Sequence, residues 1–333
     1  MSNKTYSVKD IAEMAGVSVA TVSRVINQNG RFSKETEDRV NKVIAMCNYK
    51  PNQLARGLRT SKARMIGILV PDISNEFFSR ITLALQTHLY ALNYATIIMN
   101  TNEDAEIEAN QLNMLNSQKV SGLIYISGNV GGSETPDVPA VYIDRKPSFG
   151  QEHNNYIFIE SDNYQGGILA TQALIDKGCR QIACVSYAKN VSSHRQRVEG
   201  YTAALKKNGF AVKNEHIVIA GEISADSGRR VTKELLQSHK EVDGIFFTAD
   251  VLAVGALKAI NELGLSIPGQ LKIVGFDDIA LSRLTIPSLT TIHQDIERFG
   301  LLAANALVSM IDGQPLEQKQ HTIPVRLVTR KST

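Results

Sequence analysis

The stretch SVKDIAEMAGVSVATVSRVIN, residues 7–27, decides the fold of the N-terminal part of this chain. Ser7 can cap a first helix, and Asp10 three places later completes an approximate capping box. Apolar residues then recur at helical spacing on one face, namely Val8, Ile11, Ala12 and Ala15. Gly16 breaks this helix, and Ser18 is placed to cap a second one. The stretch therefore predicts two short helices joined by a tight turn.

The second of these helices has two unlike faces. The apolar face consists of Val22, Val25 and Ile26. The opposite face consists of Ala20, Thr21 and Arg24, because steps of three and four residues bring side chains together. Two short helices joined by a Gly-containing turn form a helix-turn-helix, whose second helix enters the major groove of DNA. The alternative is an ordinary helical hairpin in a core, but a short polar face beside the turn has no use there.

Two segments carry a family resemblance, AGVSVATVSRVIN (15–27) and YKPNQLARGL (49–58). Together they resemble the lactose-repressor (LacI/GalR) family of bacterial transcription regulators, and the resemblance covers essentially the whole chain. It implies base-specific contacts from Val19, Ala20 and Arg24, and phosphate contacts around Ser18, Thr21, Ser23 and Asn27. Arginine can read guanine bidentately, and small apolar groups pack on thymine methyls. For Val19, a place in the core of the head remains the alternative.

Charge is distributed unevenly along the 333 residues, a length that predicts two or three domains. The overall charge is only +3. Residues 1–64 hold 12 Lys/Arg against 5 Asp/Glu, whereas the remainder holds 24 against 28. A basic head on a mildly acidic body is expected when only the head meets phosphate.

Several classes of protein are disfavoured by what the sequence lacks. The N-terminus has no apolar core typical of a secretory signal, and no stretch approaches the ~18 apolar residues of a membrane span. Cys47, Cys179 and Cys184 show no metal-ligand spacing and are typical of reduced thiols in the cytoplasm. There is no GxGxxG after a strand, no P-loop, no GxSxG and no HExxH. We therefore expect no enzyme activity, cofactor, metal or membrane partner.

The head is completed by a third helix that starts at Ser33, with Val40, Val43, Ile44 and Cys47 on one face. It closes a helix-turn-helix domain over residues 1–50. Pro51 suits the first position of a helix through Leu58, which is too short to be stable alone, so residues 51–64 are interpreted as a conditional hinge helix and basic linker. A plain linker is the alternative. The family implies minor-groove contacts from Asn52, Leu54, Ala55 and Leu58, with Leu58 as the wedge between base steps.

The body alternates short apolar runs with amphipathic helical patterns, which predicts an α/β architecture of parallel sheets. The runs are residues 65–70, 94–99, 122–127, 140–145, 181–187, 243–249 and 271–276. There are enough strands for two doubly wound sheets, with a break near residues 150–162. The family implies a periplasmic-binding-protein-like body with three crossings between subdomains. On that pattern the N-terminal effector subdomain comprises 65–162 and 291–321, and the C-terminal one 163–290 and 322–333.

Polar and aromatic residues fall just past the ends of these runs, where ligands bind in such folds. The set consists of Asp72, Asn75, Phe77, Phe78, Asp144, Arg145, Arg197, Asp250, Asp277 and Gln294. Carboxylates and Arg pair with hydroxyls while flat aromatic rings cover a sugar, and the family's effector pocket occupies these positions. Singly, each is equally explained by a structural role, as Asp162 is by a helix cap. Ala249, where many relatives carry Asn, and Ile223, where some use an aromatic, leave the effector no more specific than a sugar or sugar-like molecule.

The pattern as a whole indicates a cytoplasmic transcriptional repressor of carbohydrate-utilisation genes that binds a near-palindromic operator as a homodimer. The chain ends at Thr333 directly after the last predicted strand, so a dimer is expected instead of a tetramer. We expect a sugar effector to weaken operator binding. One alternative is a catabolite-control-type global regulator with a phosphoprotein corepressor. A sugar-binding transport protein is disfavoured, because it would need a signal peptide and no DNA-binding head.

Overall fold

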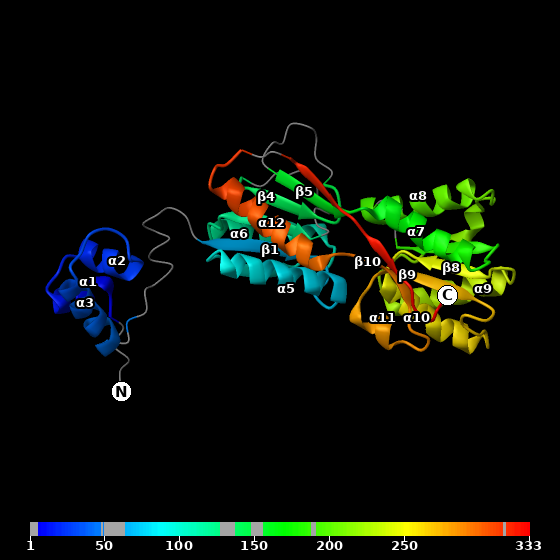
Figure 1. Ribbon diagram of the computed structural model, residues 1–333, viewed down its shortest axis with the longest axis horizontal. Helices are drawn as coiled ribbons and strands as arrows, with labels where there is room; N and C mark the ends of the chain where they lie inside the picture. Colours follow the sequence, from blue (N-terminus) through cyan, green and yellow to red (C-terminus); the bar gives the residue numbers. More distant parts are fainter. Residues whose placement is uncertain are drawn as a thin grey trace. The chain divides into compact units, whose positions relative to one another are not determined.

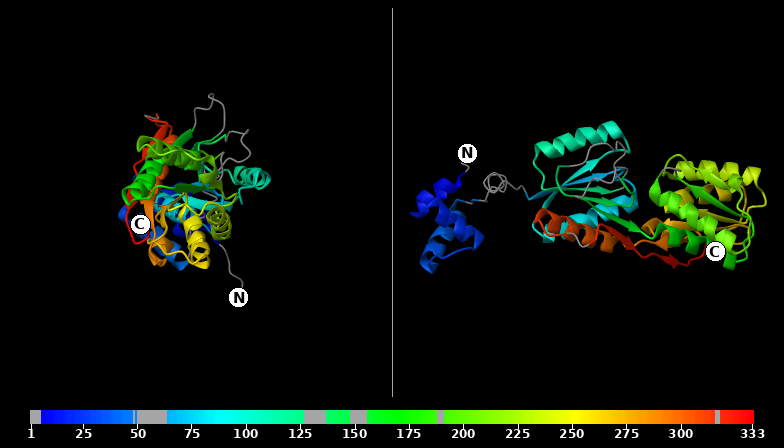
Figure 2. Two further views of the ribbon diagram at one scale, coloured as in Figure 1. Left: turned by 90° about the vertical axis from the view of Figure 1, so that its right-hand side faces the viewer. Right: turned by 90° about the horizontal axis from the view of Figure 1, so that it is seen from above.

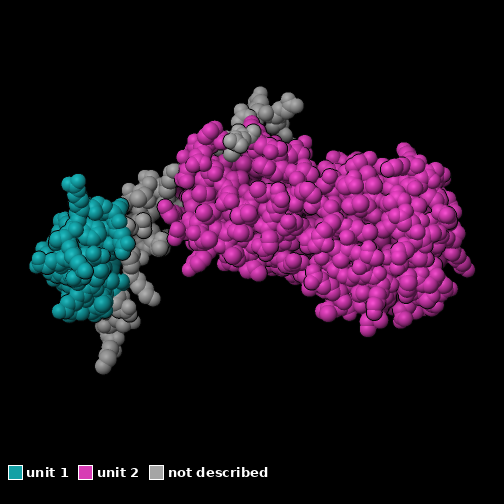
Figure 3. All heavy atoms as spheres, viewed as in Figure 1, with its two compact units in different colours: residues 1–63 teal, residues 64–333 magenta. Residues whose placement is uncertain are grey.

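The computed structural model describes residues 6–47, 49, 64–126, 137–147, 156–187, 191–315 and 318–333. The chain forms two compact units, residues 1–63 and 64–333, which Figure 3 distinguishes by colour. Each unit is described by itself.

The first unit contains the predicted helix-turn-helix and its supporting third helix. Its helices are α1 (Val8–Ala15), α2 (Val19–Asn27) and α3 (Lys34–Met46). Ser7 and Asp10 form the capping box at α1, and Gly16 ends that helix in the left-handed conformation at φ 62°. Ser18 and Ser33 cap α2 and α3 through their side chains. The predicted starts of all three helices are confirmed.

A small hydrophobic core holds these helices together. Its buried members are Ile11, Ala12, Ala15, Val22, Val25, Val40 and Val43. Val8, Ile26, Ile44 and Cys47 pack against it while staying partly exposed. The face of α2 that was predicted to be apolar therefore supports the head, whereas Ala20 and Arg24 on the other face are exposed.

The second unit alternates strands with helices along its whole length. The strands are β1 (Met65–Val70), β2 (Ala95–Asn100), β3 (Gly122–Ile126), β4 (Ala140–Ile143), β5 (Tyr156–Ser161), β6 (Ile182–Ser186), β7 (Ile217–Ile219), β8 (Gly244–Phe247), β9 (Lys272–Asp277), β10 (Thr290–His293), β11 (Gln320–Ile323) and β12 (Arg326–Val328). The helices are α5 (Glu76–Ala91), α6 (Ala105–Ser117), α7 (Asn163–Asp176), α8 (Ser192–Lys207), α9 (Ala225–Ser238), α10 (Asp250–Glu262), α11 (Ala280–Leu284) and α12 (Ile296–Ile311), with a 3₁₀ turn η1 at Asn214–His216.

These strands form two six-stranded sheets, in the orders β11-β5-β4-β3-β1-β2 and β12-β10-β9-β8-β6-β7 (Figure 1). All neighbours run parallel except β10 and β12, which are antiparallel. Strand order reverses at β1 in the first sheet and at β6 in the second. In doubly wound sheets, such reversals open a crevice at the carboxyl ends of the strands, where ligands bind.

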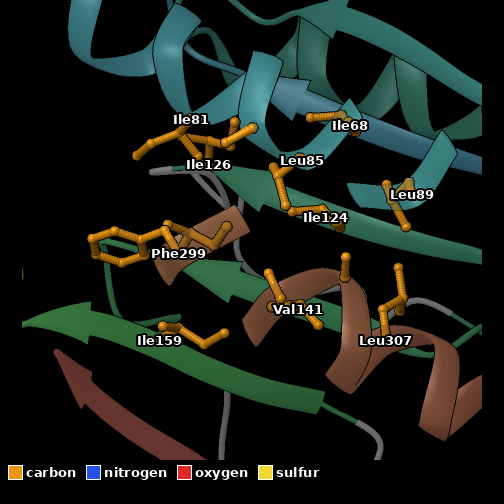
Figure 4. Close-up of a cluster of buried hydrophobic side chains, with 14 of the residues drawn as sticks. Ile68, Ile81, Leu85, Leu89, Ile124, Ile126, Val141, Ile159, Phe299 and Leu307 are labelled. Carbon is orange, nitrogen blue, oxygen red and sulfur yellow. The ribbon is translucent and has the colours of Figure 1, made fainter. Parts of the chain in front are cut away.

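Helices cover both faces of the first sheet (Figure 2). One core joins α5 and α12 to that sheet, and Figure 4 shows Ile81 and Leu85 of α5 beside the strand residues Ile124 and Ile126. A second core lies on the opposite face, where Leu115 of α6 packs among residues of β1, β3, β4 and β5. Two buried faces explain why these strands are near-continuous apolar runs.

The second sheet is covered in the same way. Ala183 and Val185 of β6 pack with α9 and α10, whereas Ile182 and Cys184 pack with α7 and α8. Successive strand residues point to opposite faces, so each helix pair receives alternate side chains. Among the described residues, no helix is both long and apolar enough to cross a membrane.

The chain passes three times between the two sheets, after β5, β10 and β11. Two predicted boundaries need correction. β10 lies in the second sheet, so residues 291–293 do not belong to the N-terminal subdomain. β11 pairs with β5, so residues 322–323 do not belong to the C-terminal one. The predicted break near 150–162 also contains β5, which pairs with β4 in the first sheet.

Candidate DNA-reading surface and effector site

The predicted DNA-contacting residues of α2 differ in exposure. Ser18, Ala20 and Arg24 are exposed, whereas Val19, Thr21 and Ser23 are half-buried. Ser18 Oγ accepts a hydrogen bond from the Thr21 amide at 3.1 Å and lies 2.9 Å from Thr21 Oγ1. These two hydroxyls therefore also fix the start of the helix, in addition to any contact with phosphate.

Val19 and Arg24 have different surroundings on this helix. Val19 packs against the core of the head, as the alternative to a base contact predicted. Its side chain is only half-buried, so part of it stays on the surface. Arg24 lies along Gly30, where a β-carbon would sit 3.3 Å from Arg24 Cδ. Asn27 is the last residue of α2. The predicted hinge contacts Asn52, Leu54, Ala55 and Leu58 lie outside the described residues.

Arg197 of α8 is the centre of the predicted effector site. Its side chain is almost fully buried, with Nε donating to Asn163 Oδ1 at 2.8 Å and Nη1 donating to the Thr248 carbonyl at 2.7 Å. The guanidinium also lies flat on Phe276, 3.7 Å from the ring centroid. Arg197 therefore has a fixed plane, with its remaining N–H groups available to carboxylates.

Two buried aspartates from different sheets flank this guanidinium. Asp144 follows β4 and lies 3.6 Å from Arg197 Nη2, while Asp277 ends β9 and lies 3.7 Å from Nη1. Both have positive φ, 72° for Asp144 and 120° for Asp277. Such conformations are costly for a residue with a β-carbon and are concentrated at functional sites. The sequence prediction placed these three residues at one site, and the structure brings them together.

Burial changes the acid–base behaviour of this cluster. Burial raises the pKa of Asp277 to about 7, with Arg197 opposing the shift and the Asp144 carboxylate adding to it. Burial also raises the pKa of Asp250 well above its usual value, assisted by the charge of Asp277. The pKa of Arg197 is lowered by burial, and Asp277 and Asp144 work against that change. Strongly shifted pKa values cluster at functional sites, although structural ion-pair networks shift them too.

Gln294 binds Asp277 directly, whereas the carboxylate of the neighbouring Asp250 binds other residues. Gln294 Nε2 donates to Asp277 Oδ1 at 2.7 Å, and no described residue pairs with the buried Gln294 Oε1. Asp250 is fully buried at the start of α10, where it accepts from Thr291 Oγ1 at 2.6 Å and from the Ile279 amide at 3.1 Å. Both carboxylate oxygens of Asp250 are therefore occupied by the protein.

The residues predicted after β1 have unequal access to this cluster. Phe77 and Phe78 are buried in the first core, with ring centroids 5.5 Å apart. Asn75 caps α5 by accepting from the Phe77 amide. Asp72 is exposed and accepts from the amide and hydroxyl of Ser74, so the structure gives it a turn-forming role.

Arg145 belongs to a second polar group that links the two subdomains. Its Nη2 donates to Glu103 Oε1 at 2.7 Å, and Glu103 also accepts from the hydroxyl of Tyr187, which follows β6. Close by, His194 Nδ1 lies 2.8 Å from Thr248 Oγ1. Burial and the nearby charges of Arg197 and Arg145 hold the pKa of His194 well below its usual value, so this imidazole is neutral.

Sequence reasoning missed several members of these groups. Glu103, Tyr187 and Thr248 each follow a strand end, after β2, β6 and β8, and the same rule that selected Asp144 would have found them. Asn163 and Ser193, which donates to Asp144 Oδ2 at 3.3 Å, lie at the starts of α7 and α8 and carry no comparable signal.

A separate cavity of about 450 Å³ lies on the second subdomain between α8 and β7. Its lining residues are Ser186, Arg195, Val198, Glu199, Thr202, Ala203, Lys206, Ile217 and Ile219. None of them belongs to the predicted effector set. The charged cluster around Arg197, instead of this cavity, has the chemistry of a polar ligand site.

Comparison with known proteins assigns the chain to a family. Residues 7–52 match the bacterial regulatory proteins of the lacI family, and residues 171–333 match a periplasmic binding protein-like domain. The ribose operon repressor of Halalkalibacterium halodurans is 36% identical over 98% of this chain and 97% of its own length. The chain belongs to the lacI family of bacterial regulatory proteins.

Other members of the lacI family agree with this. The HTH-type transcriptional repressor PurR of Histophilus somni is 33% identical over 98% of both chains. The structure of the Lac repressor dimer bound to operator and the anti-inducer ONPF has a TM-score of 0.87 at 30% identity, with 99% of each chain covered. This lacI-family chain is thus a transcriptional repressor by relationship, with a helix-turn-helix and two parallel-sheet subdomains.

The sequence also singled out Ala249 and Ile223. Ala249 is the N-cap of α10 and offers no side-chain hydrogen bond there. Ile223 is half-buried and packs against the core formed by α9 and α10.

Proposed function

We propose that this protein is a sequence-specific repressor that binds a near-palindromic operator as a homodimer and is released by a neutral sugar. The observation that carries the proposal is the buried Arg197 flanked by Asp144 and Asp277, which come from different sheets. A ligand that pairs with this cluster contacts both subdomains at once. Its binding can therefore be coupled to their relative arrangement.

The charge of the cluster favours a neutral ligand. Arg197 faces two aspartates, and Arg145 is paired with Glu103, so no excess positive charge remains for a phosphate group. Carboxylates accept hydrogen bonds from hydroxyls, the guanidinium donates to them, and Gln294 Oε1 offers a further acceptor. A polyhydroxylated molecule satisfies all of these groups, whereas a sugar phosphate would meet the aspartates with like charge.

The proposed effector class is a pentose, with D-ribose as the first candidate. The support is the ribose operon repressor, which aligns with nearly the whole chain. In this proposal Asp144, Arg197, Asp277 and Gln294 bind the sugar directly, and Asp250 positions Asp277 and the β9–α11 segment. Phe77 and Phe78 would present ring edges from the start of α5. Asp72 and Asn75 would shape the turn that precedes it.

The head would read DNA through α2. Arg24 is the exposed long side chain of that helix and can donate to two acceptors of one guanine. The net charge of residues 1–64 adds a salt-dependent attraction to phosphate. Such a repressor would work in the cytoplasm, where the operator is accessible, and homodimers suit operators with two-fold symmetry.

The principal rival effector is a purine base, which we consider because the HTH-type transcriptional repressor PurR is also among the relatives. A phosphoprotein corepressor is the other rival, and it would act on a surface outside the Arg197 cluster. These rivals differ from the proposal in what must stabilise the purified protein.

A thermal-unfolding screen of the full chain tests the proposal. D-ribose, other pentoses and hexoses, ribose 5-phosphate, hypoxanthine and guanine would be compared at equal concentration. A ligand at a hundredfold excess over its Kd stabilises the native state by about 2.7 kcal/mol. We expect a neutral sugar to raise the melting temperature of wild type and of the control Asp176→Ala, but not of Asp277→Ala. Stabilisation by a purine alone, or by no small molecule, would contradict the sugar assignment.

A further inference from the structure

Three potential metal ligands meet on the second subdomain, outside both sites described above. They are His216, His239 and Glu241, whose ligand atoms all lie within 4.8 Å of one another. His216 is buried, His239 is half-buried and Glu241 is exposed. None of them takes part in the Arg197 cluster.

The cluster is assembled from two separate segments. His216 ends the η1 turn directly before the edge strand β7, while His239 caps the C-terminus of α9 and Glu241 follows two residues later. The His216 and His239 rings meet edge to face with centroids 5.2 Å apart. All three residues precede β7 or β8, so they lie at the amino ends of these strands. The effector site lies at the carboxyl ends.

The separations fit metal ligands better than direct hydrogen bonds. Glu241 Oε1 lies 3.4 Å from His216 Nε2 and 3.5 Å from His239 Nδ1. Direct N–H···O hydrogen bonds usually span about 2.7–3.2 Å. Ligands arranged tetrahedrally at about 2.05 Å from a zinc ion would be roughly 3.3 Å apart.

The donor types also suit a transition metal. Two imidazoles and one carboxylate are a zinc-type donor set, whereas Mg²⁺ prefers oxygen ligands alone. The exposed Lys240 lies between His239 and Glu241 in sequence, and its charge is screened by solvent.

We propose that His216, His239 and Glu241 form a zinc site with water in the fourth position. Bound zinc connects the C-terminus of α9 to the start of β7, the edge strand of the second sheet. Because the ion binds the folded state, it raises the stability of the second subdomain by mass action. The zinc site shares no residue with the proposed effector site, so zinc and effector can be bound at the same time.

Titration of the metal-stripped full chain, without a polyhistidine tag, tests the site. ZnCl₂ would be added in a calorimeter to wild type, His239→Ala and Glu241→Gln, with MgCl₂ as a second titrant. Glu215→Gln is the control for charge, and His321→Gln is the control for loss of a histidine. Melting temperatures without metal show whether each variant folds.

The wild type and both controls should take up one zinc ion per chain and show a higher melting temperature with zinc. His239→Ala and Glu241→Gln should bind at least roughly tenfold more weakly, since even outer-shell changes cost about that much. Absence of saturable uptake by wild type would overturn the assignment. The assignment would also be overturned if the two site variants bound zinc as tightly as wild type does, or if wild type bound Mg²⁺ as tightly as zinc.

Discussion

At the scale of single residues, Arg197 and its two aspartates show how a polar site is built inside an apolar body. Phe276 and Asn163 fix the guanidinium, and the aspartates approach it from two sheets. Asp277 is the most informative of these residues, because burial raises its pKa to about 7 while Arg197 opposes the shift. Its protonation state therefore changes near neutral pH.

The raised pKa of Asp277 makes stability depend on pH in a defined direction. Between its unfolded pKa near 3.8 and its folded pKa of about 7, the native state holds a proton that the unfolded state has lost. The free energy of unfolding of wild type therefore falls as pH rises, by up to about 1.4 kcal/mol per pH unit from this group. Asp277→Asn removes that contribution.

Urea unfolding at several pH values between about 5 and 7 measures this effect. The difference in unfolding free energy between Asp277→Asn and wild type should increase with pH. Asp176→Asn, which changes an exposed aspartate of α7, is the matched control at each pH. A constant difference for Asp277→Asn would show that this carboxyl group is already ionised in the native state.

Arg24 is the residue on which base reading by the head should depend. Arg24→Ala should weaken operator binding by roughly 1–3 kcal/mol and relax the base preference at one position. Arg39→Ala removes another exposed charge, from α3, and should act on operator and random DNA alike. Fluorescence anisotropy with both DNAs at fixed salt provides the comparison. Equal losses for Arg24→Ala on the two DNAs would exclude it from base reading.

At the scale of elements, the two serine caps of the head offer a matched pair. Ser18 and Ser33 accept from the amides three residues later at 3.1 and 3.2 Å. Each Oγ also lies 2.9 Å from the hydroxyl of that same residue. The two caps are alike in geometry, but only Ser18 begins the helix that is proposed to read DNA.

Replacing either serine by alanine should therefore destabilise the head by about 1 kcal/mol. Only Ser18→Ala should weaken operator binding beyond that shared effect, because it also removes the proposed phosphate contact at the start of α2. Thermal unfolding of the head and operator titration would be run on both variants. An equal loss of operator affinity in the two variants would remove Ser18 from the DNA contacts.

The elements were predictable to different degrees, for physical reasons. The seven apolar runs match β1, β2, β3, β4, β6, β8 and β9 closely. Strands covered by helices on both faces are continuously apolar, whereas the edge strand β2 is an apolar run although none of its residues is buried. β10 and β11 were missed because TTIH and QHTI are largely polar, and β7 because it spans only three half-buried residues. Their pairing is set by neighbouring strands instead of by their own composition.

The candidate effector site was predictable in its charged centre and less so around it. Asp144, Arg197 and Asp277 follow the strand-end rule or the family pattern, and the structure unites them. Asp250 obeys the same rule, yet its oxygens bind Thr291 and the Ile279 amide, a tertiary contact that no local pattern contains.

At the scale of the whole molecule, the two subdomains share several polar contacts. Arg197 and Ser193 reach Asp144 near the effector cluster, and Tyr187 reaches Glu103. Ala280, which lies two residues after Asp278, donates its amide hydrogen to Glu76 Oε1 at 2.5 Å. A ligand at Asp144 and Asp277 must therefore alter contacts that hold the subdomains together. Since it can shift their equilibrium only by its differential affinity, the coupling is measurable.

Operator affinity titrated against the sugar that stabilises the protein most is the direct test of a ligand-switched repressor. In wild type, saturating sugar should weaken operator binding by about 5–150-fold, which corresponds to a coupling of about 1–3 kcal/mol. Asp277→Ala should bind the operator as tightly as sugar-free wild type and fail to respond to sugar. The account would be contradicted if wild-type affinity stayed constant or rose while sugar bound, or if Asp277→Ala responded at the same sugar concentration.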